Sequence, residues 1–74
     1  MTRLPTLTAR EVVAALKRAG FVEHRKRGSH FHLWHPDKRR VTTVPIHSRD
    51  LPRSVLKEII RQAGLTEGEF RLLL

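Results

Sequence analysis

The chain has 74 residues, of which 15 are Lys or Arg and 7 are Asp or Glu, so its formal net charge is +8 when its five histidines are neutral. This length predicts a single domain, residues 1–74, that is too small to enclose a large substrate cavity. The absence of cysteine excludes disulfides and thiolate zinc sites. Neither a signal peptide nor an apolar run near the roughly 20 residues of a membrane span is present, so we expect a soluble cytoplasmic protein with no membrane contact.

The excess of basic residues predicts a polyanionic partner, most simply nucleic acid. Charge alone leaves open the alternative of an ordinary soluble basic surface. An anionic membrane is a poorer match. A membrane-surface helix gathers its cations opposite a broad apolar face rich in aromatic side chains, and neither of the two longer helices predicted below does so.

The first predicted element is an amphipathic helix of about three turns. Its start fits a capping box, in which the Thr8 hydroxyl and the Glu11 carboxylate close opposite ends of the first turn. Gly20 favours a left-handed stop at its end. The apolar residues of its stripe recur at helical spacing and are Ala9, Val12, Val13, Leu16 and Ala19.

Three short strands are predicted next. Residues 21–26 form the first strand, which Gly28-Ser29 breaks. Residues 30–35 form the second strand, and their alternation gives it two different faces. The residues of these faces are Phe31 and Leu33 on one side and His30, His32 and Trp34 on the other.

Residues 36–39 form a turn, because Pro36 fixes φ and Asp37 can bond its own backbone. The β-branched residues 40–44 return as the third strand, and Pro45, which lacks a donor, ends it.

The remainder of the chain predicts a second main helix and a short final one. The second helix starts at Pro52 and closes at Gly64, and a second capping box at residues 66–69 precedes the final helix, which includes Phe70 and residues 72–74. The order predicts an α+β fold. Two main helices cover one side of a three-stranded antiparallel sheet, and the other side is open to solvent.

The open face of the middle strand has the most chemical content. His30, His32 and Trp34 project there, beside the basic run of residues 24–27. Histidine exchanges a proton near neutral pH, with an ordinary pKa of about 6.5. Arg and Lys hold phosphate and stabilise the charge that develops in phosphoryl transfer, and tryptophan can stack on an unpaired base. Because RNA carries its own 2′-hydroxyl nucleophile and DNA does not, a metal-free histidine site favours RNA.

Each of these residues also has a plainer interpretation. A strand histidine is most often a solvated polar residue. Trp34 suits packing or a protein interface, and residues 25–27 alone would position a phosphate or form an ordinary solvated turn. His30 and His32, with His35 and His47 nearby, suggest zinc, but neither a cysteine nor a paired carboxylate completes the shell, so no metal is expected.

Four ordered motifs give the sequence a family resemblance. They are Gly28-Ser29-His30, His35-Pro36-Asp37, Val44-Pro45-Ile46-His47 and residues 56–66. Together they closely resemble the HicA family, also called YcfA-like, of small bacterial toxins from toxin–antitoxin pairs. The opening helix that ends in Ala19-Gly20-Phe21 fits as well, so the resemblance covers nearly the whole chain. One departure is Lys38, where relatives commonly have glycine, so we expect a wider or differently shaped turn.

The resemblance implies a fold like that of a double-stranded-RNA-binding domain and ribosome-independent cleavage of mRNA. It also implies neutralisation by a HicB antitoxin encoded beside the toxin. It makes His30 the catalytic histidine, with Gly28 and Ser29 in the tight turn before its strand. It implies no metal and no organic cofactor.

We therefore predict a metal-independent endoribonuclease toxin with His30 as general acid and base. The predicted RNA and phosphate contacts are Arg25, Lys26, Arg27, Gly28, Ser29 and Trp34. The candidates for a second proton-transfer group are His24, His32 and His47. Two alternatives stay open on the same fold, namely a non-catalytic RNA-binding module and a protein-interaction domain.

Overall fold

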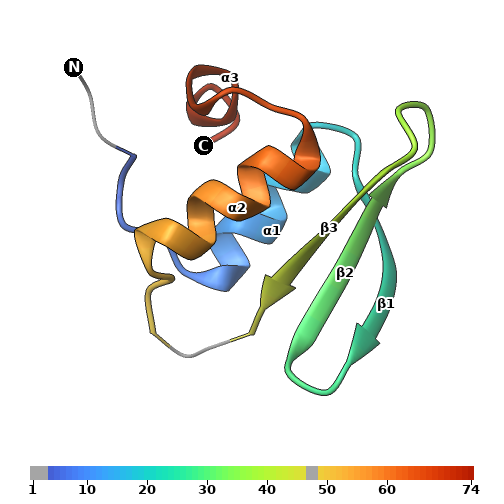
Figure 1. Cartoon of the computed structure of the whole chain (residues 1–74), viewed down its shortest axis with the longest axis horizontal. Helices are drawn as coiled ribbons and strands as arrows, with labels where there is room; N and C mark the ends of the chain where they lie inside the picture. Colours follow the sequence, from blue (N-terminus) through green and yellow to red (C-terminus); the bar gives the residue numbers. More distant parts are fainter. Residues whose placement is uncertain (1–3, 47–48) are drawn as a thin grey trace.

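The computed structural model describes residues 4–46 and 49–74 and has an α+β architecture. A helix, three strands and two further helices follow one another along the chain (Figure 1), which confirms the predicted order. The elements are α1 Ala9–Arg18, β1 Val22–Arg27, β2 His30–His35, β3 Arg40–Pro45, α2 Arg53–Ala63 and α3 Glu67–Arg71.

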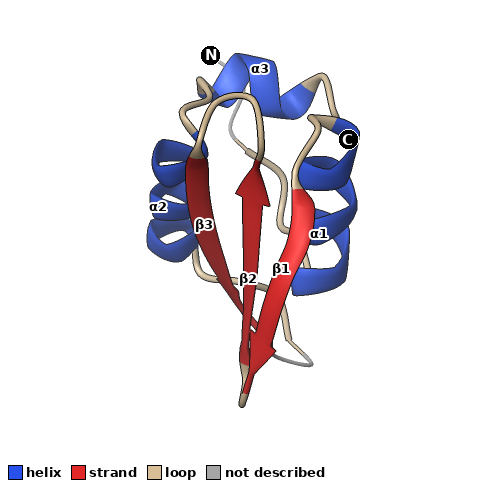
Figure 2. Ribbon diagram, turned by 90° about the vertical axis from the view of Figure 1, so that its right-hand side faces the viewer, coloured by secondary structure: helices blue, strands red, loops and turns tan. Residues whose placement is uncertain are grey.

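The three strands form one antiparallel sheet in the order β1-β2-β3. Figure 2 shows α1 and α2 behind this sheet, whose other face is open toward the viewer. The core lies between the two layers, and its largest fully buried apolar side chains are Phe70, Leu16, Leu33, Leu56, Ile59, Val12 and Val44. The predicted two-layer arrangement is confirmed. None of the described helices is both long and apolar enough to cross a membrane.

The structure confirms the predicted capping box at the start of α1 and the left-handed glycine after its end. The Glu11 backbone N–H donates to Thr8 Oγ1 at 3.3 Å, and the Glu11 carboxylate accepts from the Thr8 backbone N–H at 2.9 Å, so the capping box is complete. Gly20 then turns the chain toward β1 with φ +102°, a conformation that favours glycine. A Cβ at Gly20 would lie 2.7 Å from His35 Nε2, so the available space requires glycine as well.

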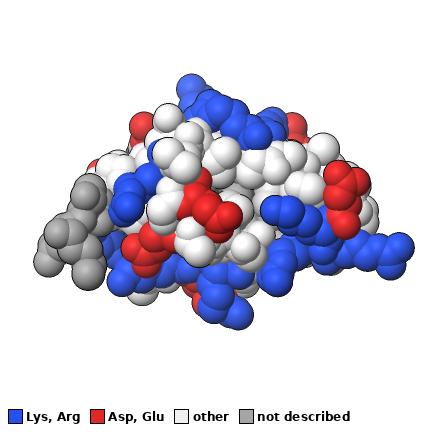
Figure 3. Space-filling view, turned by 90° about the horizontal axis from the view of Figure 1, so that it is seen from above, with Lys and Arg blue, Asp and Glu red and all other residues white. Residues whose placement is uncertain are grey.

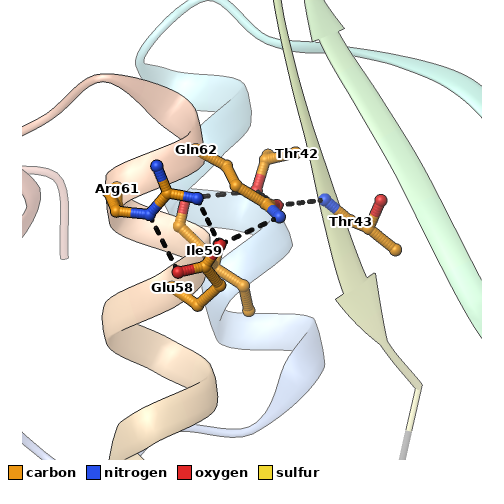
Figure 4. A network of polar contacts seen from close by, with 6 residues as sticks. All are labelled: Thr42, Thr43, Glu58, Ile59, Arg61 and Gln62. Carbon is orange, nitrogen blue, oxygen red and sulfur yellow. Dashed lines mark hydrogen bonds and ion pairs between the residues drawn. The ribbon is translucent and has the colours of Figure 1, made fainter.

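A buried polar network holds α2 against β3 (Figure 4). The Thr42 hydroxyl lies 3.1 Å from the Ile59 carbonyl oxygen and 3.1 Å from Gln62 Oε1, and Thr42 is 0% exposed. Gln62 Oε1 also accepts a hydrogen bond from the Thr43 backbone N–H at 3.2 Å. A buried hydroxyl without a partner costs about 1–3 kcal/mol, so this network fixes how α2 lies on β3.

Several element boundaries differ from the prediction. Phe21 precedes β1 and packs in the core at 2% exposed. Pro45 is the last residue of β3 instead of the residue after it, which an edge strand tolerates because its outward N–H positions need no partner. α3 ends at Arg71, so residues 72–74 lie beyond the helix that was predicted to include them.

The turn between β2 and β3 occupies four residues, 36–39. The Arg39 N–H donates to the His35 carbonyl at 2.8 Å, and Arg39 itself is left-handed with φ +53°. Lys38, the departure from the family pattern, is therefore accommodated without a left-handed conformation of its own.

Candidate functional site

Strand β2 separates the two faces of the sheet as predicted. Leu33 is 0% exposed and His35 is 8% exposed, and both point toward the helices. His30 is exposed on the opposite face, which His32 and Trp34 share as half-buried residues. The grouping of these three side chains on the open face is confirmed.

A β-bulge in β1 decides which of its basic side chains reach the open face. Glu23 pairs with Leu33, and Arg25 pairs with the adjacent β2 residue, His32. His24 therefore has no partner on β2 and is the extra residue of the bulge. Glu23 lies on the helix side, where its carboxylate is 2.9 Å from Lys17 Nζ on α1. Because the bulge shifts the alternation by one residue, Arg25 lies on the open face.

Cross-strand pairing arranges the open face in three rows. The rows are Val22, Trp34 and Val41; then Arg25, His32 and Thr43; then Arg27, His30 and Pro45. The first row is apolar, the second is polar, and the third lies beside the turn between β1 and β2. These nine residues include two arginines and two histidines but no carboxylate. The sequence prediction placed only β2 residues on this face. Cross-strand pairing adds four residues that it did not name, Val22, Val41, Thr43 and Pro45.

The predicted phosphate-binding run of residues 25–27 is divided between the two faces. Arg25 and Arg27 lie beside the histidines, whereas Lys26 pairs with Phe31 on the helix side. Lys26 lines a groove of about 460 Å³ between α1 and the inner face of the β1–β2 hairpin. The other lining residues are Ala9, Arg10, Val13, Ala14, Lys17, Phe31 and Ile46.

Backbone and side-chain contacts position the two histidines of the open face. The Ile46 N–H donates to the Ser29 carbonyl at 2.6 Å, which ties the turn before His30 to the chain that follows β3. His32 Nδ1 lies 3.0 Å from Thr43 Oγ1, and this contact orients its ring. Alternate residues of a strand are about 6.6 Å apart, so both imidazoles can approach one phosphodiester from the same side.

His35 has a structural role. The Lys38 backbone N–H donates to His35 Nδ1 at 3.2 Å, so Nε2 carries the ring hydrogen and donates to the Ala19 carbonyl at 3.2 Å. The Phe21 ring packs edge-on against this imidazole, with centroids 5.2 Å apart and planes at 87°. Both ring nitrogens are engaged on the helix side, away from His30.

The remaining predicted site residues have separate positions. Gly28 and Ser29 form the turn before β2, where Gly28 is left-handed with φ +58°. His24 is in the bulge of β1. His47 lies outside the described residues. Within residues 4–46 and 49–74, no three His, Asp or Glu side chains gather as the ligands of a metal ion would.

Basic residues lie at both ends of β2. Arg27 pairs with His30 at one end, and Arg40 pairs with His35 at the other. Figure 3 shows Lys and Arg at the top and along the lower and right-hand edges of this view, with Asp and Glu in smaller separate patches. The carboxylates with a lowered pKa lie on helices, where Thr8 binds Glu11, Arg61 binds Glu58 and Thr66 binds Glu69. The nine residues of the open face include two arginines and no carboxylate, so their positive charge is not neutralised within the face.

Comparison with known proteins gives the family. A family model described as "HicA toxin of bacterial toxin-antitoxin" matches residues 9–65 of the 74-residue chain. The match starts with α1 and extends just past α2, so it includes the whole sheet and its open face. No curated protein matches the chain. Because the family match spans well over half of the sequence, the chain belongs to the HicA family of bacterial toxin–antitoxin toxins.

Proposed function

We propose that this HicA-family toxin is a metal-independent endoribonuclease that cleaves mRNA in the cytoplasm, with His30 as general acid and base. The composition of the open face carries the proposal. An exposed His30 lies directly opposite Arg27, His32 and Arg25 form the adjacent row, and the face has no carboxylate. Such a surface attracts a phosphodiester chain, and the exposed histidine supplies the proton transfer that cations cannot.

The reaction uses the 2′-hydroxyl of RNA as the nucleophile. One histidine takes the hydroxyl proton, the 2′-oxygen bonds to the adjacent phosphorus, and the bond from phosphorus to the 5′-oxygen breaks. The leaving 5′-oxygen receives a proton from the second proton-transfer group, which acts as the acid, so the products are a 2′,3′-cyclic phosphate and a 5′-hydroxyl. Arg25 and Arg27 bind the phosphate and stabilise the charge that develops on its oxygens.

His32 is the best-placed second proton-transfer group among the described histidines. It shares the open face with His30 and is oriented by Thr43. His24 occupies the bulge, and His35 is engaged on the helix side. One imidazole acting as base and the other as acid gives a bell-shaped dependence of the cleavage rate on pH.

The His30→Ala variant tests the proposal. We expect its rate of RNA cleavage to fall by about 10²- to 10⁴-fold and its expression no longer to arrest growth. His24→Ala is the matched control, because His24 is an exposed histidine of the same sheet without a pairing partner on β2. It should cleave at the rate of the unaltered protein. If His30→Ala cleaves RNA and arrests growth as the unaltered protein does, His30 is not the catalytic histidine.

A modified substrate tests the nucleophile separately. An RNA with a single 2′-deoxynucleotide at the mapped cut should bind normally and stay uncut there. Cleavage of that modified position would exclude attack by the 2′-oxygen. Binding of unmodified RNA that stays intact at every pH would make the domain a non-catalytic RNA-binding module.

The partner in this proposal is a HicB-like antitoxin that covers the open face. The row of Val22, Trp34 and Val41 offers an apolar anchor, and the neighbouring arginines match carboxylates of a partner. An antitoxin bound there would exclude RNA from His30.

A further inference from the structure

We propose that the row of Val22, Trp34 and Val41 is a base-stacking subsite, which selects single-stranded RNA with an unpaired base about two nucleotides from the cleaved phosphate. The proposal rests on the proposed function, because the distance is counted from His30. It adds the form of the substrate and the side chain that recognises it.

The row forms an exposed apolar platform on an otherwise polar face. Val22 is 45% exposed and Val41 is 51% exposed, and they flank Trp34 on the two neighbouring strands. Cross-strand contact between an aromatic ring and β-branched neighbours restrains the ring. Trp34 is only half-buried, so part of the indole remains accessible to a flat ligand.

The position of the row suits a strand of RNA that runs along β2. Trp34 and His30 are four residues apart on one face of the strand, which places them about 13 Å apart. The row of Arg25, His32 and Thr43 lies between them. Each row then takes one nucleotide of an extended strand. A base stacks on Trp34, the next phosphate meets Arg25, and the cleaved phosphate lies between Arg27 and His30.

The composition of the other two rows suits RNA as the ligand of Trp34 in the free toxin. Each of these rows carries an arginine and neither carries a carboxylate, so a continuous cationic path leads from the indole to His30. Aromatic side chains on an open sheet are the stacking platforms of single-strand RNA-binding modules. A base paired within an A-form helix is not free to stack on a side chain, so this subsite rejects duplex RNA.

The fluorescence of Trp34 provides a direct measurement, because it is the chain's one tryptophan and tyrosine is absent. The full-length His30→Ala protein, which we expect to leave RNA essentially intact during a titration, is titrated with a single-stranded RNA that contains the mapped cleavage site. We expect binding to quench the emission. An abasic nucleotide moved along the RNA should abolish the quenching at one position, two nucleotides from the cut, and the same RNA in a duplex should not quench.

Substitutions measure the energy of the contact. Trp34→Ala should weaken binding by about 5- to 150-fold and should remove the effect of the abasic nucleotide, whereas Trp34→Phe should restore most of the affinity. Leu72→Ala is the control, since Leu72 is an 87% exposed apolar residue outside the sheet, and it should bind RNA as the parent does. Circular dichroism shows that each variant is folded.

The outcomes separate the subsite from the nuclease. Cleavage of RNA with unchanged emission on binding, or an abasic scan without a distinct position, overturns the subsite and leaves the nuclease. Quenching that a single abasic position abolishes, in an RNA that the unaltered protein binds but does not cleave, supports base stacking on Trp34 and overturns the nuclease. Quenching by an antitoxin but by no RNA overturns the subsite and makes the row a protein interface.

Discussion

Gly20 packs so closely against His35 that the two residues depend on one another. An alanine Cβ at Gly20 would approach His35 Nε2 to 2.7 Å, and the backbone there has φ +102°. A left-handed backbone alone costs a non-glycine residue about 1–2 kcal/mol. We expect Gly20→Ala to lower the free energy of unfolding by more than this, because the imidazole must also leave the Ala19 carbonyl. Urea denaturation measures the change.

Gly28→Ala is the matched control for this prediction. Gly28 is also left-handed, with φ +58°, but nothing lies within 4 Å of the added Cβ. Its substitution should therefore show the backbone cost alone, about 1–2 kcal/mol. Equal losses in the two variants would show that the contact with His35 contributes nothing.

Two capping carboxylates predict a loss of stability in acid. Bonds from Thr8, first from its backbone N–H and then from its side chain, hold the pKa of Glu11 below the usual 4.5, and Thr66 does the same for Glu69. A carboxyl whose pKa is lowered by folding stabilises the fold when ionised. That contribution is fully present above pH 4.5 and is lost as the pH falls through the lowered values.

A double variant measures this contribution. Glu11→Gln with Glu69→Gln keeps an acceptor in each capping box but does not titrate. Between about pH 7 and about pH 3, it should therefore lose less free energy of unfolding than the unaltered protein. Urea denaturation at the two pH values compares them, and equal losses would contradict the prediction.

The histidines show what sequence predicts at the residue scale. The outward position of His30 and His32 follows from alternation with Phe31 and Leu33. The role of His35 does not, because its partners come from the end of α1 and from the turn after β2. Thr43 was within reach of sequence reasoning, since pairing across a four-residue turn places it opposite His32.

At the scale of the element, the β1 bulge is the feature that sequence reasoning missed. Unbroken alternation from Val22 would turn Lys26 outward and Arg25 toward the helices. Residues 24–27 are all basic, so no apolar side chain among them marks the inner face. By contrast, the two-layer fold could be predicted from the sequence. The apolar stripes of α1 and α2 recur with the period of a helix, and the residues of β2 alternate with the period of a strand.

The divided basic run predicts different salt effects for adjacent cations. Arg25→Ala and Arg27→Ala should each reduce the slope of log affinity for single-stranded RNA against log salt concentration by about 0.7, because each removes a phosphate contact. Lys26→Ala should leave the slope unchanged, since Lys26 lies on the helix side. Fluorescence anisotropy at several salt concentrations tests all three. A slope that drops for Lys26→Ala and stays for the two arginines would place the RNA in the α1 groove.

At the scale of the whole molecule, the proposed antitoxin complex should hide His30. All three rows lie on one open face, with basic residues at both ends of β2. One protein surface can therefore cover the three rows together. We expect bound antitoxin to slow the modification of His30 by diethyl pyrocarbonate and to compete with RNA. Undiminished modification of His30 in an inhibited complex would indicate inhibition from another surface.

The bond between Gln62 and Thr43 also limits how this sheet can grow. The backbone polar groups of residues 41, 43 and 45 point away from β2, toward the free edge of the sheet. The Thr43 N–H donates to Gln62 Oε1, and Pro45 has no N–H, so neither residue offers a free donor at this edge. A foreign strand therefore finds β3 a poor template. At the other edge, the bulge and the basic side chains of β1 also disfavour strand addition, so neither edge of the sheet invites polymerisation.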